Sequence, residues 1–158
     1  MTADMAPVSP SFRPATASDA DHLIELMRAF YATFSYPFDD DAARAALAPV
    51  LEPDSERGRA WIIEAQGQIA GYVALMLGHS LEYRGRDAFL DELYVMPAWR
   101  GKGFATTAVE VVARACRELG VRALHLEVER DNTAAQALYR HFGFEDHDRY
   151  LMTKRIAP

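Results

Sequence analysis

The feature that most constrains this chain is the stretch over residues 92–106, in which a short apolar segment runs through two glycines straight into a helical pattern. The apolar segment ends at Pro97, which has no backbone N–H to donate and therefore closes a strand. After Gly103, apolar residues recur every four positions, which is the spacing of one buried helix face: Phe104, Ala108, Val112 and Cys116. The first turn of such a helix leaves backbone N–H groups unpaired, and Gly101 and Gly103 have no Cβ to keep a ligand away from them. The stretch therefore predicts a strand–turn–helix unit that can bind an anion.

Strand and helix patterns alternate along the rest of the chain. Short apolar runs predict strands, helical spacing of apolar residues predicts helices, and Gln66–Gly67 predicts the tight turn of a hairpin. In chain order, we expect a strand over 12–15, helices over 20–35 and 39–51, strands over 61–63 and 69–77, a loop over 78–87, a strand over 89–96, a helix over 103–119, a strand over 121–128, a helix over 132–141, and closing strands from 144 and over 150–156. This order predicts an α/β (α+β) fold, with a mixed sheet covered by helices on both sides.

The length of 158 residues fits a single domain, which we place at residues 12–158 behind a flexible leader at residues 1–11. With 17 Lys and Arg against 23 Asp and Glu, the formal net charge is −6, which disfavours binding to nucleic acid. The longest apolar stretch, over 69–77, is far shorter than the roughly 18–20 residues that cross a bilayer, so we expect no membrane partner. Because Cys116 is the single cysteine and the N-terminus lacks a signal-peptide pattern, we expect a cytoplasmic protein.

Two other glycine motifs that bind phosphate fit this stretch poorly. A dinucleotide-binding turn needs a third Gly or Ala where Thr106 stands, and the Pro97–Trp99 segment lengthens the turn. A Walker A loop needs four residues between its glycines and then Lys and Ser or Thr, which is a spacing that this chain lacks. From the turn alone, a plain loop with Arg100 and Lys102 facing water stays open as an alternative.

Two linked motifs make the sequence resemble a known family. The acyl-CoA pyrophosphate loop of the GNAT superfamily of N-acetyltransferases is similar to the run Val95-x-Pro97-x-x-Arg100-Gly101-Lys102-Gly103-x-Ala105. A later motif of the same family is similar to the run Asn132-x-x-Ala135-x-x-Leu138-Tyr139-x-x-x-Gly143-Phe144. The resemblance is good over residues 61–150 and looser over the first helices.

The resemblance implies acetyl-CoA as the cofactor and a mostly antiparallel sheet in which two central strands splay apart to form the cofactor cleft. Backbone groups of Leu93, Tyr94 and Val95 would pair with the pantetheine arm. The pyrophosphate would lie in the loop and first helical turn formed by Arg100, Gly101, Lys102, Gly103, Phe104, Ala105 and Thr106. Asn132, with Ala135 of the same motif, would contact the cofactor from the later helix.

The implied reaction uses a base that frees a neutral amine and an acid that protonates the departing thiolate. We expect the acid at Tyr139 of the second motif, because a phenol with an ordinary pKa of about 10 is protonated at neutral pH. We expect the base at Glu92, with the adjacent Asp91 or a water molecule as alternatives. Because neighbouring side chains on a strand point to opposite faces, only one of these carboxylates is expected to reach the acceptor cleft. The resemblance also implies that a backbone N–H near Leu93 or Val95 polarises the acetyl carbonyl.

The acceptor implied by the family is a primary amine of a small molecule or protein. The residues expected to border its site are Tyr36, Phe38, His79 and Asp91. Tyr31 is close to this set, but its helical spacing is more typical of a core residue. The acidic composition fits a cationic acceptor such as a polyamine, an aminoglycoside or a lysine side chain, with a protein N-terminus or an amino acid as alternatives. The five histidines include no closely spaced pair of the kind that binds zinc, so no metal is expected.

The position of Cys116 on an apolar helix face makes it a core residue rather than a nucleophile. We therefore expect an acetyl-CoA-dependent N-acetyltransferase in which the amine attacks directly in a ternary complex, without an acyl-enzyme. A domain of the same family that binds acyl-CoA as a sensor or regulatory module, without turnover, is the alternative. The closing strands would supply the contact of a homodimer, which members of the family often form.

Overall fold

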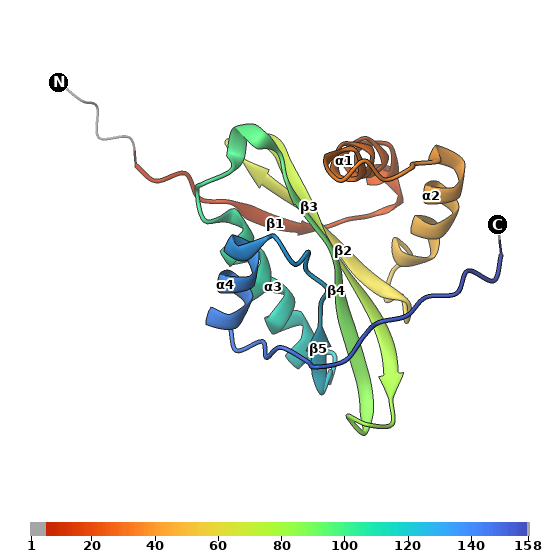
Figure 1. The fold of residues 1–158 in the computed structure, drawn as a ribbon. Coiled ribbons are helices and arrows are strands. Elements are labelled where there is room, and N and C mark those ends of the chain that lie inside the picture. The colour runs from red at the N-terminus through yellow and green to blue at the C-terminus, as the bar shows by residue number, and fades with distance from the viewer. Residues whose placement is uncertain (1–5, 158) are drawn as a thin grey trace. The chain divides into compact units, whose positions relative to one another are not determined.

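The computed structural model describes residues 6–157, which divide into a first unit that ends at Glu127 and a second unit that begins at Val128. The first unit contains a five-stranded sheet in the order β1-β2-β3-β4-β5 (Figure 1). Its strands are β1 (Ser11–Pro14), β2 (Gly58–Ala65), β3 (Gln68–Ser80), β4 (Gly85–Val95) and β5 (Ala123–His125). The first three strand pairs are antiparallel and the β4–β5 pair is parallel, so the predicted mixed, mostly antiparallel sheet is confirmed.

Helices cover both faces of this sheet. On one face, α1 (Ala20–Thr33) and α2 (Asp40–Leu47) pack in a cluster that includes Ile62. On the other face, Phe104 of α3 (Phe104–Glu118) packs with Ile63. Because consecutive side chains of a regular strand point to opposite faces, these neighbours on β2 contact different helices. Short 3₁₀ turns complete the unit, namely η1 (Ala17–Asp19), η2 (Ala48–Val50) and η3 (Pro97–Trp99).

The β2–β3 hairpin agrees with the prediction from the sequence, whereas the β3–β4 hairpin differs from it. Gln66 and Gly67, between β2 and β3, have φ angles of 50° and 72°, which is the left-handed conformation that two-residue hairpin turns require. Between β3 and β4, pairing of Gly78 with Asp87 and of His79 with Arg86 extends both strands. The prediction of a loop over 78–87 is wrong because ladder pairing with a long neighbouring strand outweighs the weak strand propensity of these residues.

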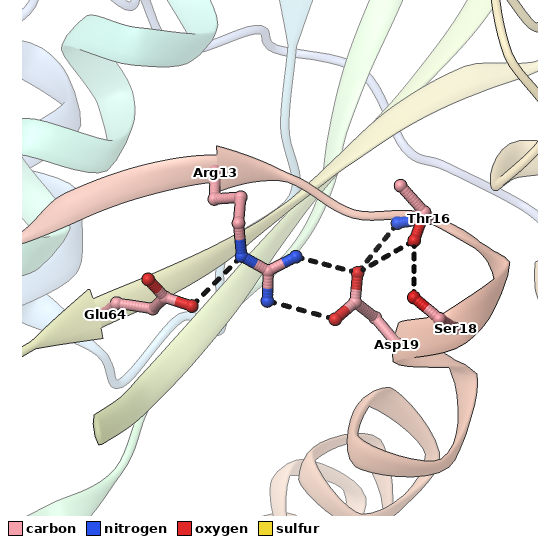
Figure 2. A network of polar contacts seen from close by, with 5 residues as sticks. All are labelled: Arg13, Thr16, Ser18, Asp19 and Glu64. Carbon is pink, nitrogen blue, oxygen red and sulfur yellow. Dashed lines mark hydrogen bonds and ion pairs between the residues drawn. The ribbon is translucent and has the colours of Figure 1, made fainter. Parts of the chain in front are cut away.

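The start of α1 is tied to the edge of the sheet by an ion-pair network (Figure 2). Arg13 on β1 donates through Nη1 and Nη2 to the two carboxylate oxygens of Asp19, at 2.9 and 3.0 Å, and through Nε to Glu64 Oε1 at 3.0 Å. The Asp19 carboxylate also accepts from the backbone N–H of Thr16 at 2.8 Å. Hydrogen bonds from the Arg13 guanidinium hold the pKa of Asp19 below its usual range. The network fixes the path by which the chain leaves β1 for α1.

The second unit contains α4 (Thr133–His141), which agrees with the predicted helix over 132–141. Asn132 is the N-cap of this helix, and its side-chain oxygen accepts from the backbone N–H of Ala135 at 3.2 Å. This hydrogen bond satisfies a backbone N–H of the first turn, which favours a helix start at Thr133.

The C-terminal segment differs from the prediction. In the part of the chain that the structure describes after α4, up to residue 157, no strand forms, so the closing strands expected from 144 and over 150–156 are wrong. A strand needs a neighbouring edge for its N–H and C=O groups, whereas Tyr150, Met152 and Ile156 are 86%, 90% and 88% exposed. The strand expected over 121–128 is also shorter, because β5 pairs with β4 only over Ala123–His125.

Part of the leader expected over residues 1–11 lies outside the described residues, because the description begins at residue 6. Pro158 also lies outside them. Within that leader, Val8 packs against the cluster around Phe104, and Ser11 already belongs to β1. Among the helices of residues 6–157, none is both long and apolar enough to cross a membrane.

Candidate active site

The turn between β4 and α3 has the conformation that its glycines predict. Gly101 and Gly103 have φ angles of 72° and 80°, in the left-handed region that residues with a Cβ rarely adopt. Gly103 is the N-cap of α3, so the N–H groups of the first helical turn have no carbonyl one turn earlier to bond. A Cβ built on either glycine meets no described atom within 4 Å, and Lys102 between them is exposed. The turn is therefore open to an anion.

An aromatic and a basic side chain hold this loop against the end of β4. Arg100 donates through Nε to the backbone oxygen of Val95 at 2.8 Å, and its guanidinium lies 5.6 Å from the centre of the Tyr94 ring. The Trp99 ring stacks on Phe104, with 6.0 Å between ring centres. These contacts orient Arg100, so the loop carries a fixed positive charge in a protein whose net charge is −6.

The edge of β4 that faces away from β3 is unpaired along its second half. β5 pairs only with residues 87–89 of β4. Over residues 90–95, no strand of the described chain pairs with this edge. Backbone groups of the Leu93–Val95 segment on this edge, apart from the Val95 oxygen that accepts from Arg100, are therefore available to an extended ligand.

A β-bulge changes the orientation of the two adjacent carboxylates of β4. On β3, Ala74 pairs with Glu92 while the next residue, Leu75, pairs with Leu90, so Asp91 is an extra residue in the ladder. The strict alternation of side chains is lost at the bulge, and both Asp91 and Glu92 line one pocket. This differs from the alternation expected of a regular strand, in which only one of the two carboxylates would reach a given face.

This pocket, called the carboxylate pocket below, has a volume of about 160 Å³ and lies between α1, α2 and the sheet. Its lining residues are Leu23, Met27, Tyr31, Ala46, Leu47, Val50, Ala60, Tyr72, Ala74, Met76, Asp91 and Glu92. Polar atoms are concentrated in the two tyrosines and the two carboxylates. A larger cavity, of about 710 Å³, is lined instead by residues 14–18, 50–54 and 59–61 and by the end of α3. The smaller pocket holds two adjacent carboxylates and two tyrosine hydroxyls, which can bind an amine and accept its proton. We therefore take it as the candidate acceptor site.

Two tyrosine hydroxyls hold the Glu92 carboxylate. Tyr72 donates its O–H to Glu92 Oε1 at 3.1 Å, and Tyr31 forms a second side-chain hydrogen bond with Glu92. Burial raises the pKa of Glu92, and the two hydrogen bonds offset part of this effect. Burial also raises the pKa of Asp91 and the pKa of each tyrosine. The pocket therefore contains carboxylates that accept a proton more readily than exposed ones, beside hydroxyls that remain protonated.

Tyr31 and Tyr72 contribute to the site although no local sequence pattern marks them as polar site residues. The helical spacing of Tyr31 indicates a core residue, and Tyr72 is only 1% exposed on a central strand. The strand register places Tyr72 beside Glu92, because Ala74, two residues further along β3, pairs with Glu92. Only this long-range pairing identifies the tyrosine as part of a polar site.

The structure separates the other residues expected at the acceptor site. Phe38 packs edge-on against Tyr31 with 5.3 Å between ring centres, so it adjoins a residue of the pocket wall. Tyr36 lies 6.5 Å from the Tyr31 ring and is 52% exposed. His79 lies on β3 beyond Met76, the last residue of that strand in the pocket lining. The pocket therefore does not extend to His79, and His79 belongs to a strand rather than to the loop expected from the sequence.

Tyr139 and Asn132 belong to the second unit. Tyr139 on α4 is half-buried and packs edge-on against Phe144, with 5.7 Å between ring centres. Burial raises the pKa of Tyr139, so its phenol is protonated at neutral pH. The side-chain oxygen of Asn132 is engaged in the cap of α4 with Ala135, which gives this motif a structural role in addition to any contact with a cofactor.

Comparisons with known proteins agree with this geometry. Residues 23–144 match the family described as "Acetyltransferase (GNAT) family". The chain belongs to the GNAT family of acetyltransferases. Among its GNAT relatives, the uncharacterized N-acetyltransferase YjgM of Escherichia coli (strain K12) is 29% identical over 150 residues, which cover 92% of this chain and 87% of the relative.

Solved structures show the same GNAT fold. An integron cassette protein, HFX_CASS3, from the mobile metagenome of Cole Harbour Salt Marsh has a TM-score of 0.82 and 35% identity, over 93% of this chain and 91% of that chain. The aminoglycoside N-acetyltransferase AAC(6')-Iy, solved in complex with CoA, has a TM-score of 0.79 and 20% identity, over 98% and 100% of the two chains. At this identity the second likeness shows the fold alone.

The residues of the loop fit the cofactor of a GNAT enzyme. Two open glycines, the unpaired N–H groups at the start of α3 and the charges of Arg100 and Lys102 suit the pyrophosphate of acetyl-CoA. The unpaired edge of β4 suits its amide-bearing arm. The protein is therefore an acetyl-CoA-dependent acetyltransferase. Within residues 6–157, no group of three His, Cys, Asp or Glu side chains is arranged to hold a metal ion.

Proposed function

We propose that this protein transfers an acetyl group from acetyl-CoA to the primary amine of a small molecule or protein, by direct attack of the amine in a ternary complex. The observation that carries the proposal is the Glu92 carboxylate, which lies in the carboxylate pocket under hydrogen bonds from Tyr31 and Tyr72. Glu92 is also on the strand that leads into the glycine loop. A base that lines a pocket for the acceptor, on the strand that leads to the loop suited to the acyl donor, fits the needs of this reaction.

Glu92 acts as the general base in this proposal. A primary ammonium must lose a proton before its nitrogen can attack, and the carboxylate accepts that proton directly or through a water molecule. Burial raises the pKa of Glu92, which makes the carboxylate a better proton acceptor than an exposed glutamate. Asp91, in the same pocket, adds negative charge that attracts the ammonium.

Tyr139 acts as the general acid. Acetyl-CoA, when bound, supplies an activated acetyl thioester. The protonated phenol of Tyr139 donates its proton to the departing sulfur, and the raised pKa of this side chain keeps the proton available at neutral pH. A backbone N–H of the Leu93–Val95 segment donates to the acetyl oxygen and stabilises its negative charge. The support for both assignments is the position of these residues in the family motifs.

The state of Cys116 supports direct attack over a covalent route. Cys116 is on the buried face of α3 and is 6% exposed. Burial raises the pKa of its thiol to about 11, so the thiolate that a nucleophile requires is scarce at neutral pH.

Release of free CoA thiol from acetyl-CoA, measured against a panel of amines, tests the proposal. We expect release that depends on a primary amine, and we expect Glu92→Gln to lower kcat/KM about 10²- to 10⁴-fold without weakening acetyl-CoA binding. Glu25→Gln is a matched control, because Glu25 is exposed on α1 and outside the pocket lining. Binding of acetyl-CoA without amine-dependent release would favour the sensor alternative.

Tyr139→Phe tests the acid separately. The substitution removes only the hydroxyl, so we expect normal affinity for acetyl-CoA and slower transfer at saturating acetyl-CoA. Turnover equal to that of the parent enzyme, with amines of ordinary basicity, would contradict the acid role.

A further inference from the structure

We propose that the carboxylate pocket binds the acceptor as a small, unbranched aliphatic primary amine, with its ammonium between Asp91 and Glu92 and its alkyl chain against the apolar wall beneath α1 and α2. This inference rests on the proposed acetyl transfer and names the substrate class of that reaction. Four properties of the pocket carry it, namely its gradient of burial, its charge, its wall chemistry and its size.

The pocket has a mostly apolar inner end and an open rim. Leu23, Ala60 and Val50 are 1%, 6% and 9% exposed and form the apolar part of the inner end, where Tyr72, also 1% exposed, directs its hydroxyl to Glu92. Asp91 and Ala46 are exposed and form the rim. An amine whose ammonium lies near the carboxylates can therefore bury its alkyl chain in the aliphatic interior.

The charge of the pocket selects a cation. Asp91 and Glu92 contribute two carboxylates, and no Lys, Arg or His is found among the described residues that line the pocket. An ammonium supplies the missing positive charge and has three N–H donors for the carboxylate oxygens. An amino acid would bring its own carboxylate into a site that already holds two, which is unfavourable.

The wall of the pocket disfavours ligands whose alkyl chain carries polar groups. Beyond the carboxylates and the two tyrosines, the lining consists of Leu, Val, Ala and Met side chains, which offer hydroxyl groups no hydrogen-bond partner. Burying an unpaired hydroxyl against such a wall costs about 1–3 kcal/mol of the binding free energy, roughly five- to 150-fold in affinity. Amino sugars are disfavoured for this reason.

The volume of the pocket limits the length of the chain. A cavity of about 160 Å³ is close to the roughly 150 Å³ of an apolar cavity that holds one benzene molecule. Six heavy atoms therefore fill it, which corresponds to an amine of about five carbons. Each methylene buried up to that length should tighten binding about fourfold.

Isothermal titration of the CoA-bound protein with n-alkylamines, from ethylamine to octylamine, tests this inference. We expect affinity to rise about fourfold per methylene up to about five or six carbons and then to level off. 6-Aminohexanoate and 6-amino-1-hexanol should each bind at least about fivefold more weakly than hexylamine. A flat series, or tighter binding of the carboxylated amine, would overturn the assignment.

Adjacent alanines on α2 provide matched variants. Ala46 lines the pocket, whereas Ala45 is exposed on the same helix and does not. Ala46→Leu should weaken binding of both hexylamine and ethylamine, because the larger side chain narrows the rim, and Ala45→Leu should change neither. Equal effects of the two substitutions would contradict the pocket as the site of the alkyl chain.

Binding and turnover together separate this inference from the proposed function. Binding that depends on chain length, without release of CoA, would disprove acetyl transfer to these amines and support the pocket assignment. Amine-dependent release of CoA at equal kcat/KM for hexylamine and 6-aminohexanoate would support acetyl transfer and overturn the proposed specificity.

Discussion

At the scale of single residues, the hydrogen bond between Tyr72 and Glu92 sets the properties of the site. Tyr72 is 1% exposed in the apolar cluster beneath α1, and its hydroxyl donates to the carboxylate at 3.1 Å. Burial raises the pKa of Glu92 because the charged form loses hydration, while the hydrogen bond lowers it because the hydroxyl stabilises that form. The balance between these opposing effects determines the pH above which Glu92 can act as a base.

Tyr72→Phe should move the acidic limb of the kcat/KM profile to higher pH. The substitution removes a donor that stabilises the carboxylate, so the pKa of Glu92 rises further. Because the base must be deprotonated, activity at pH values below the new pKa should fall, while activity on the plateau is retained. Steady-state rates across pH measure this effect, and Tyr150→Phe, at an 86% exposed position, is the control. An acidic limb that stays in place would show that another group titrates.

At the scale of elements, the sequence predicts what local geometry determines. Pro97 ends β4 and the spacing from Phe104 defines α3, because these effects act within a few residues. The bulge at Asp91 depends instead on the register between β3 and β4, which no local pattern encodes. For this reason the sequence identifies Glu92 and Asp91 as candidates, but it does not predict that both line one pocket, nor that Tyr72 lies beside Glu92. The prediction of closing strands was wrong for a similar reason. A segment with a strand pattern forms a strand only where the edge of another strand is available to pair with it.

Gly103→Ala should weaken binding of CoA while leaving the fold intact. The φ angle of 80° makes a Cβ cost about 1–2 kcal/mol, which is small against the roughly 5–15 kcal/mol stability of a domain. The added methyl group meets no described atom, but it stands where phosphate oxygens would approach, so we expect at least about tenfold weaker binding. Gly67→Ala is the matched control, because Gly67 has a φ of 72° and similar open space in a hairpin turn. Titration with CoA and urea unfolding of both variants measure the two effects, and equal CoA affinities would remove the loop from the site.

Asp19→Asn should destabilise the junction between β1 and α1. The variant loses the charge that pairs with Arg13, and we expect the free energy of unfolding to fall by about 1–3 kcal/mol at neutral pH. Because the native pKa of Asp19 is lowered, its stabilising effect is present above the unfolded pKa and is lost as pH falls through the native pKa. The difference between parent and variant in urea should therefore shrink in acid. Asp21, whose side chain is 86% exposed, pairs with Arg44, and Asp21→Asn should change stability by less than about 1 kcal/mol.

At the scale of the whole molecule, the residues proposed for catalysis are divided between the two units. The glycine loop and Glu92 lie before Glu127, whereas Asn132 and Tyr139 lie after Val128. The family match over residues 23–144 includes parts of both. Each of these roles predicts that CoA stabilises the unit that carries the residue. A ligand that binds only the native state raises the free energy of any opening that breaks its site.

Hydrogen exchange with and without CoA therefore tests whether the second unit takes part in the site. At a concentration about a hundred times its Kd, CoA should stabilise the bound state by about 2.7 kcal/mol, and amides that open only when the site is lost should slow by up to about a hundredfold. We expect this protection both in the first turns of α3 and in α4. The exposed segment over 150–156 serves as an internal reference, because its amides should exchange rapidly in either state. Protection confined to α3 would contradict the roles given to Asn132 and Tyr139, and the acid would then have to be sought among the residues of the first unit.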